Sequence, residues 1–151
     1  ALSEIRHLKA RMERERIPRG TDPRRHLKLG PGGMSDVEFA VQVLQLQHGT
    51  DEPALRERNT FDALRAASTA GLMRDEDARR SIEAYSFLMR LRNRLFFISG
   101  KPVDALPTRP EDLEAIGIAM GFTDQPRQEI EEEYLRVTRR ARAISEPLIY
   151  G

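Results

Sequence analysis

The spacing of apolar residues, in segments that glycine and proline separate, most constrains what this chain can fold into. The C-terminal segment shows it most clearly, because an apolar residue recurs every third or fourth position: Ile130, Tyr134, Val137, Ala141, Ile144 and Leu148. Such spacing places the residues on one narrow stripe of an α-helix. Pro126 stands at the expected first position of this helix, where a proline removes no backbone hydrogen bond. The segment therefore predicts a long helix that packs along one neighbour.

The same signals predict helices elsewhere in the chain. They are expected at the N-terminus through Leu2, Ile5, Leu8 and Met12, from Ser35 to about His48 before Gly49, over 60–70 before Gly71, from about Asp75 to Ile98 before Gly100, and from Pro110 to Gly121. In the second of these the apolar positions cover more than one stripe, which predicts burial between neighbours: Val37, Phe39, Ala40, Val41, Val43, Leu44 and Leu46. The fold class predicted is all-α, a bundle of about six helices.

The composition limits the expected location of the protein and the kinds of site that it can contain. The chain has no cysteine, so disulfides and thiolate metal sites are excluded and a reducing cytoplasm is the expected location. No stretch approaches the roughly 20 consecutive apolar residues that a membrane-spanning helix requires. Residues 1–29 carry nine Lys/Arg against four Asp/Glu, which favours an anionic partner. Because the acidic residues alternate with the basic ones, a solvated helix face is the more economical interpretation.

The stretch HLKLGPGGMSDVEF, residues 26–39, is the least regular part of this pattern. Leu27 and Leu29 alternate with Lys28, which predicts a short strand over 26–29, although a lone strand needs partners. Three glycines follow, and Ser35 stands three residues before Glu38 as in a capping box. The lysine precedes the glycines, so this is not a P-loop. Two interpretations stay open: a backbone that approaches a phosphate, or a hinge between a strand and a helix.

Paired carboxylates do not indicate a metal site here. Asp36 and Glu38 are two residues apart, about 200° around a helix, so they cannot share one ion. Asp75 and Asp77 form a D-x-D pair, but they open a predicted helix, where acidic residues serve as N-terminal caps. The three histidines, at positions 7, 26 and 48, lack the spacing of metal ligands.

Three arginines interrupt the apolar pattern of the helix predicted over 75–98. Arg90 and Arg94 share one face, and Arg92 points the other way. A charge among core residues needs either an acidic partner or a bound phosphate. We expect ion pairs within the bundle, and the phosphate remains the alternative.

A longer stretch of the sequence matches the pattern of a known family. HLKLGPGGMSDVEFAVQVLQLQHG, with PRG before it and FLMRLRNRL about forty residues after it, resembles the glutamine synthetase adenylyltransferase family. Members of that family add AMP to a tyrosine of glutamine synthetase and remove it. The residues that meet the family pattern are Lys28, Gly30, Gly32, Gly33, Asp36, Val37, Glu38, Phe39 and Gln42. Of the family's two catalytic halves, the match is closer to the second, C-terminal adenylylating half.

The resemblance implies a division of the chain. Residues 1–33 would be the end of a nucleotidyltransferase domain, with 26–29 as the last piece of its sheet, and residues 34–151 would be the helical bundle domain. The family uses ATP and Mg²⁺, and its metal-binding carboxylates lie upstream of this motif. We therefore expect no catalytic residue, no metal site and no bound cofactor within this chain, and no activity of the chain alone.

The resemblance also implies site residues and partners. Lys28, Asp36 and Glu38 would line the mouth of the active site, with Lys28 at a phosphate. The glycines Gly30, Gly32 and Gly33 would face the nucleotide, and Arg92 and Asn93 would point the same way. Expected partners are the upstream nucleotidyltransferase domain, glutamine synthetase and the PII regulatory protein. Neither a membrane nor a nucleic acid is expected.

Three alternatives stay open at this point. The first is the helical domain of a PII uridylyltransferase, which shares the layout but matches the glycine motif less well. The second is a helical interaction module whose basic N-terminal helix binds nucleic acid, which salt-dependent binding would reveal. The third is a structural bundle without a ligand.

Overall fold

The computed structural model describes residues 1–151 and contains helices and turns but no strand. Its elements are α1 (Leu2–Arg16), η1 (Pro23–Arg25), α2 (Met34–His48), η2 (Pro53–Leu55), α3 (Thr60–Thr69), α4 (Asp75–Ser99), α5 (Pro110–Ala119) and α6 (Pro126–Tyr150). The all-α bundle predicted from the sequence is confirmed, with six α-helices. None of these helices combines the length and the apolarity that a membrane crossing needs.

Proline and glycine set the helix ends largely where the sequence predicts them. Pro110 and Pro126 occupy the first turns of α5 and α6. Gly100 caps α4 in the left-handed conformation at φ 72°, which costs glycine little because it has no Cβ. Pro147 lies inside the last turns of α6, a position that the apolar spacing did not indicate.

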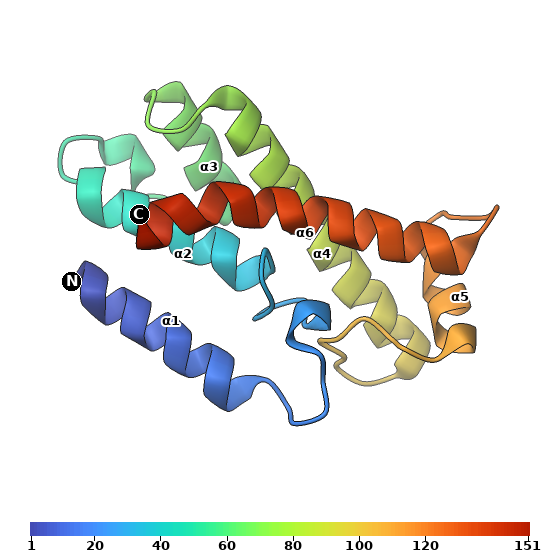
Figure 1. Ribbon diagram of the computed structural model, residues 1–151. Coiled ribbons are helices and arrows are strands. Elements are labelled where there is room, and N and C mark those ends of the chain that lie inside the picture. The colour runs from blue at the N-terminus through green and yellow to red at the C-terminus, as the bar shows by residue number, and fades with distance from the viewer.

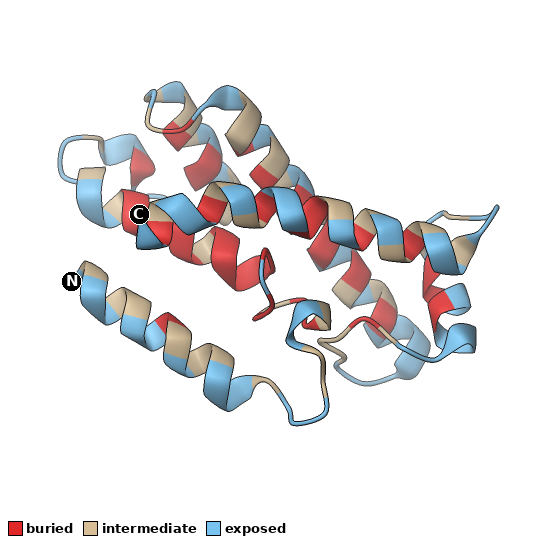
Figure 2. Ribbon diagram, in the orientation of Figure 1, coloured by how far each residue is buried: buried red, intermediate tan, exposed pale blue.

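The main core lies where α6 crosses the bundle. Figure 1 shows α6 running along the molecule, and it packs against α2, α4 and α5. The predicted stripe of α6 is confirmed, since Ile130, Tyr134, Val137 and Ala141 belong to the buried core. Figure 2 shows the buried residues gathered on the inner faces of the helices. Leu46, which was expected to be buried in α2, is 54% exposed because it lies on the last turn of α2, where the neighbouring side chains also reach solvent.

Helix α1 packs apart from this core. It lies beside α2 and the C-terminal part of α6 (Figure 1). A second apolar cluster joins them, in which Leu2, Ile5 and Met12 of α1 pack against Phe39, Ala40, Val43 and Ile149. Leu8 follows the same spacing but is 43% exposed. The helix therefore has only a small apolar contact area, and polar contacts must contribute to its attachment.

The strand expected over 26–29 is not formed. His26 makes one isolated antiparallel bridge with Ala105, and the chain then turns through residues 27–29. The Leu27 amide donates to the Asp104 carbonyl at 2.7 Å, and the Leu106 amide donates to the Arg25 carbonyl at 2.8 Å. The expected edge therefore pairs within this chain, and Leu27 is completely buried. The division at residue 33 stays a prediction.

Candidate functional site

Three of the residues predicted to form a site come together with a fourth that was not predicted. Lys28, Glu38, Arg92 and Asp104, from here on the Lys28 cluster, are all partly exposed. Arg92 Nε donates to Asp104 Oδ1 at 2.7 Å, so the ion pair expected for Arg92 is formed within the bundle. Burial raises the pKa of Glu38 above its usual range, while the nearby charges of Lys28 and Arg92 act in the opposite direction.

Backbone hydrogen bonds hold the Lys28 cluster in place. The Lys28 carbonyl accepts from the Ser35 amide at 2.8 Å, which fixes the Lys28 backbone against the first turn of α2. Asp104 serves twice, because its carboxylate accepts from Arg92 while its carbonyl accepts from the amide of Leu27. The loop between α4 and α5 therefore connects Arg92 of α4 to the turn that carries Lys28.

His26 lies beneath this cluster and stays neutral. It is 5% exposed, and its Nδ1 accepts from the Leu29 amide at 3.0 Å, which requires an unprotonated nitrogen. Burial lowers the pKa of His26, and the charge of Asp104 opposes this effect while Lys28 and Arg92 add to it. Protonation of His26 would therefore remove an acceptor from the turn that carries Lys28.

The glycines of the motif make close backbone contacts. A Cβ on Gly32, which has φ +72°, would lie 1.8 Å from the Thr138 carbonyl oxygen of α6. A Cβ on Gly30 would lie 2.4 Å from the Pro23 carbonyl oxygen, and one on Gly33 would lie 2.7 Å from the Leu27 carbonyl oxygen. Real Cβ atoms almost never approach so closely. Packing within the chain therefore accounts for all three glycines.

The amides of this turn and of the first turn of α2 are already occupied. Gly30 donates to the His26 carbonyl and Gly33 to the Gly30 carbonyl, each at 2.9 Å. The first amides of α2, on residues 34–36, donate to the carbonyls of residues 27, 28 and 33. The capping box predicted from Ser35 and Glu38 is therefore wrong, because backbone carbonyls take the place of side-chain caps and α2 has Gly33 at its N-cap. These amides offer no free donor to a phosphate.

Asp36 does not join the Lys28 cluster. It faces the other side of α2, as the angle between positions 36 and 38 predicts, and is 1% exposed. Its Oδ2 accepts from the Gly32 amide at 2.6 Å and from Arg142 Nη1 at 3.1 Å. Its Oδ1 lies 2.5 Å from Lys9 Nζ, an ion pair without the angle of a hydrogen bond.

Lys9, Glu13, Asp36 and Arg142 form a second group, which we call the Asp36 cluster. Lys9 is 1% exposed and pairs with Glu13 of its own helix as well as with Asp36. Burial lowers the pKa of Lys9, but the two carboxylates outweigh it and the net shift is upward, so Lys9 is charged at neutral pH. The solvated face expected for this part of α1 is therefore wrong at Lys9.

The remaining predicted residues are more peripheral. Asn93 is exposed and has no hydrogen bond to another side chain. Arg90 is exposed, and neither it nor Arg94 forms an ion pair, so only Arg92 meets the expectation of pairing. Asp75 begins α4 as predicted but does not cap it, because its carboxylate accepts from the Ser68 hydroxyl.

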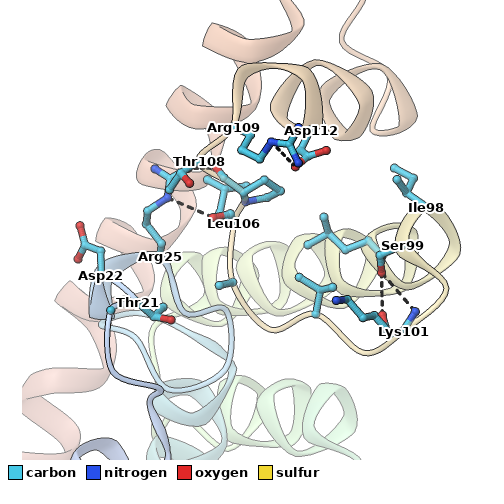
Figure 3. Close-up of a pocket in the computed structure, with 15 residues that line it drawn as sticks. Thr21, Asp22, Arg25, Ile98, Ser99, Lys101, Leu106, Thr108, Arg109 and Asp112 are labelled. Carbon is cyan, nitrogen blue, oxygen red and sulfur yellow. Dashed lines mark hydrogen bonds and ion pairs between the residues drawn. The ribbon is translucent and has the colours of Figure 1, made fainter.

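Four pockets of about 390 to 590 Å³ are lined by none of the residues of the Lys28 cluster. Figure 3 shows one of them, a hollow of about 490 Å³ between residues 20–25, the end of α4 and the loop 101–109. Arg25 lines it, but its guanidinium already donates to the carbonyls of Leu106 and Pro107 and to Glu131. None of the predicted site residues lines this hollow. The chain also has no group of three or more His, Asp or Glu side chains that could hold a metal ion.

Sequence reasoning missed three residues that organise these clusters: Asp104, Lys9 and Arg142. Asp104 lies in a loop, and its contacts with Arg92 and Leu27 join segments that are distant in the sequence. The periodicity of apolar residues does not predict such contacts. Lys9 occupies the same helical stripe as Ile5 and Met12, and this position was the one available signal for its burial. A lysine in an apolar stripe indicates a carboxylate partner on a facing helix.

The comparisons with known proteins agree with the motif match. A family model described as GlnD PII-uridylyltransferase matches residues 5–149. Proteins named bifunctional glutamine synthetase adenylyltransferase/adenylyl-removing enzyme are 48% identical in Streptomyces avermitilis and 47% identical in Streptomyces coelicolor, each over the whole chain. The protein of that name in Cutibacterium acnes is 45% identical over 99% of the chain. The resemblance stated from the sequence is thereby confirmed, and the chain spans 15% of the length of each of these relatives.

Proposed function

This chain belongs to the GlnD PII-uridylyltransferase family, and we propose that it is the helical domain of a longer glutamine synthetase adenylyltransferase. The observation that carries the proposal is the 48% identity, over the full chain, to a protein of that name. The proposed location is the cytoplasm. The upstream nucleotidyltransferase domain, glutamine synthetase and the PII protein are the proposed partners, and the C-terminal half is the proposed place of the chain.

The proposed reaction is transfer of AMP from ATP to a tyrosine. The phenol oxygen forms a bond to the α-phosphorus, the bond from that phosphorus to the bridging oxygen breaks, pyrophosphate leaves and the phenol loses its proton. Negative charge on the phosphate oxygens needs cationic groups that are already in place. Lys28 is partly exposed, is held by its backbone and forms no ion pair, so we assign it to a phosphate. Arg92 is held beside it by Asp104.

The proposed reaction also requires Mg²⁺. Adenylyl transfer of this type uses Mg²⁺ to neutralise charge on the nucleotide. Because this chain lacks a group of three or more side chains that could hold a metal ion, its residues do not fit the ion. We therefore propose that the metal ligands lie in another segment of the longer protein.

The assignment of Lys28 is tested in the full-length enzyme. Lys28→Ala is expected to lower kcat for adenylylation by about 100-fold, the usual effect of removing one preorganised donor to transition-state charge. Lys101→Ala is the matched control, since Lys101 is an exposed lysine outside the Lys28 cluster. Circular dichroism checks that both variants keep the helical fold. A wild-type rate in the folded Lys28 variant would refute the assignment.

A second candidate, uridylylation of PII, is favoured by the description of the matching family. Glutamine synthetase with labelled ATP, and PII with labelled UTP, offered to the same full-length enzyme, separate the two. Label on glutamine synthetase alone supports the first proposal, and label on PII alone supports the second.

A further inference from the structure

We propose that Lys9 and Arg142 are positioning residues for Lys28, acting through Asp36 and the turn of residues 27–33. The inference rests on the function proposed above. It assigns a role to a buried cluster that does not touch the Lys28 cluster and that no expectation from the sequence explains.

Asp36 is linked by a hydrogen bond to the turn of residues 27–33. Asp36 Oδ2 accepts from the amide of Gly32, at the tip of the turn, at 2.6 Å. The other end of the turn is bound to the start of α2, through the carbonyls of Leu27 and Lys28. Gly32 also lies against the Thr138 carbonyl of α6. Lys28 therefore lies in a turn that is bound to α2 at one end and held at its tip by the Asp36 carboxylate and by the contact with Thr138.

Two cations hold the Asp36 carboxylate in place. Asp36 is 1% exposed, and a buried carboxylate keeps its charge and place only if cations accompany it. Lys9 of α1 supplies one at 2.5 Å, and Arg142 of α6 supplies the other at 3.1 Å. The ring of Tyr150 faces both cations, with its centroid 5.8 Å from Lys9 Nζ and 5.7 Å from Arg142 Cζ. Two helices thus meet at the group that holds the tip of the turn.

Helix α1 is attached to the bundle partly through the Asp36 cluster. Its apolar contact with the bundle involves Leu2, Ile5 and Met12, and the ion pair of Lys9 with Asp36 is a further contact that joins it to α2. Arg6 adds a hydrogen bond from Nε to the Ile149 carbonyl at 2.6 Å. A displacement of α1 would remove a cation from Asp36 and free the turn. A change in the position of α1 is therefore expected to change the position of Lys28.

The test begins with hydrogen exchange in this chain. Lys9→Met keeps the length and apolar stem of the side chain but removes the cation. We expect the Gly32 amide to exchange about tenfold faster or more, because the buried Asp36 carboxylate keeps only Arg142 as a cation and holds the turn less firmly. Arg11→Met is the control, since Arg11 is exposed on the same helix. Equal exchange of the Gly32 amide in the two variants would overturn the proposal.

The second measurement is kinetic and uses the full-length enzyme well below its melting temperature. Lys9→Met is expected to lower kcat about 10- to 100-fold, as misplacement of a catalytic group does. Adding Asp36→Asn should restore kcat to within about threefold of the wild type, because it removes the buried negative charge that has lost Lys9 and keeps an oxygen for the Gly32 amide. A merely structural role would lower the melting temperature and leave the kcat of the folded enzyme unchanged.

The outcomes separate this inference from the function that it rests on. A wild-type kcat for Lys9→Met beside a reduced kcat for Lys28→Ala overturns the positioning role and leaves the proposed function standing. A wild-type kcat for Lys28→Ala overturns the site assignment itself, whatever Lys9→Met does. Loss of kcat in Lys9→Met without recovery in the double variant also counts against positioning through Asp36.

Discussion

Replacing Gly32 with alanine separates two explanations of the glycine motif. If the glycine is needed for packing, Gly32→Ala should destabilise this chain without any nucleotide. Two costs add at this position. Alanine at φ +72° costs about 1–2 kcal/mol, the penalty of the left-handed region for a residue with a Cβ. The new Cβ would also lie 1.8 Å from the Thr138 carbonyl oxygen, and the shift that this forces costs about 1–3 kcal/mol more.

The chain supplies its own control for the first cost. Gly100 has the same φ of +72°, but a Cβ there would meet nothing within 4 Å. Gly100→Ala should therefore lose only about 1–2 kcal/mol, whereas Gly32→Ala should lose about 2–5 kcal/mol. Urea unfolding followed by circular dichroism measures both, with the m-value checked for constancy. Equal losses in the two variants would refute the packing explanation and favour the alternative that Gly32 faces the nucleotide.

The remaining predictions concern ionisation near Lys28. Glu38→Gln should stabilise this chain at pH 7 by about 0.5 kcal/mol or more, because burial disfavours the carboxylate, as its raised pKa indicates. Urea unfolding measures this gain, which should shrink at lower pH as acid protonates Glu38 in the wild type. His26 has a lowered pKa in the folded state, so the stability that its neutral form contributes is complete above the ordinary value of 6.5 and is lost as the pH falls below it towards the lowered folded-state pKa. Unfolding free energies from pH 7.5 to 5 should fall more steeply for the wild type than for His26→Gln, and parallel curves would contradict the assignment.

The helices were predictable because each has periodic apolar residues and is bounded by proline, glycine or other residues typical of helix ends. The long helix expected from about Asp75 to Ile98 is observed as α4, Asp75–Ser99, and Pro110 and Pro126 mark the starts of α5 and α6. These signals are local, so a single sequence contains them in full. Lys28, Glu38 and Arg92 lie near one another, and the family resemblance rather than periodicity suggested Arg92, whereas Asp36, which was expected beside them, faces the other side of α2. Their role at a nucleotide stays a prediction.

The long-range polar contacts were not predictable in the same way. The pairing of Lys9 with Asp36 joins two helices whose relative placement no local pattern reports. The capping box at Ser35 failed because the preceding turn folds back and its carbonyls reach the helix amides before any side chain is needed. The strand over 26–29 failed because alternation over so few residues also suits a buried turn.

The contact between Gly32 and α6 does not depend on the side chain of residue 138. The atom of residue 138 that touches Gly32 is the carbonyl oxygen, which every amino acid possesses. Exchanges of the side chain at 138 would therefore leave the contact intact, and no compensating pair of substitutions would record it. An aligned set of such chains would show an invariant glycine with no co-varying partner, even though its neighbour lies on a helix more than a hundred positions later.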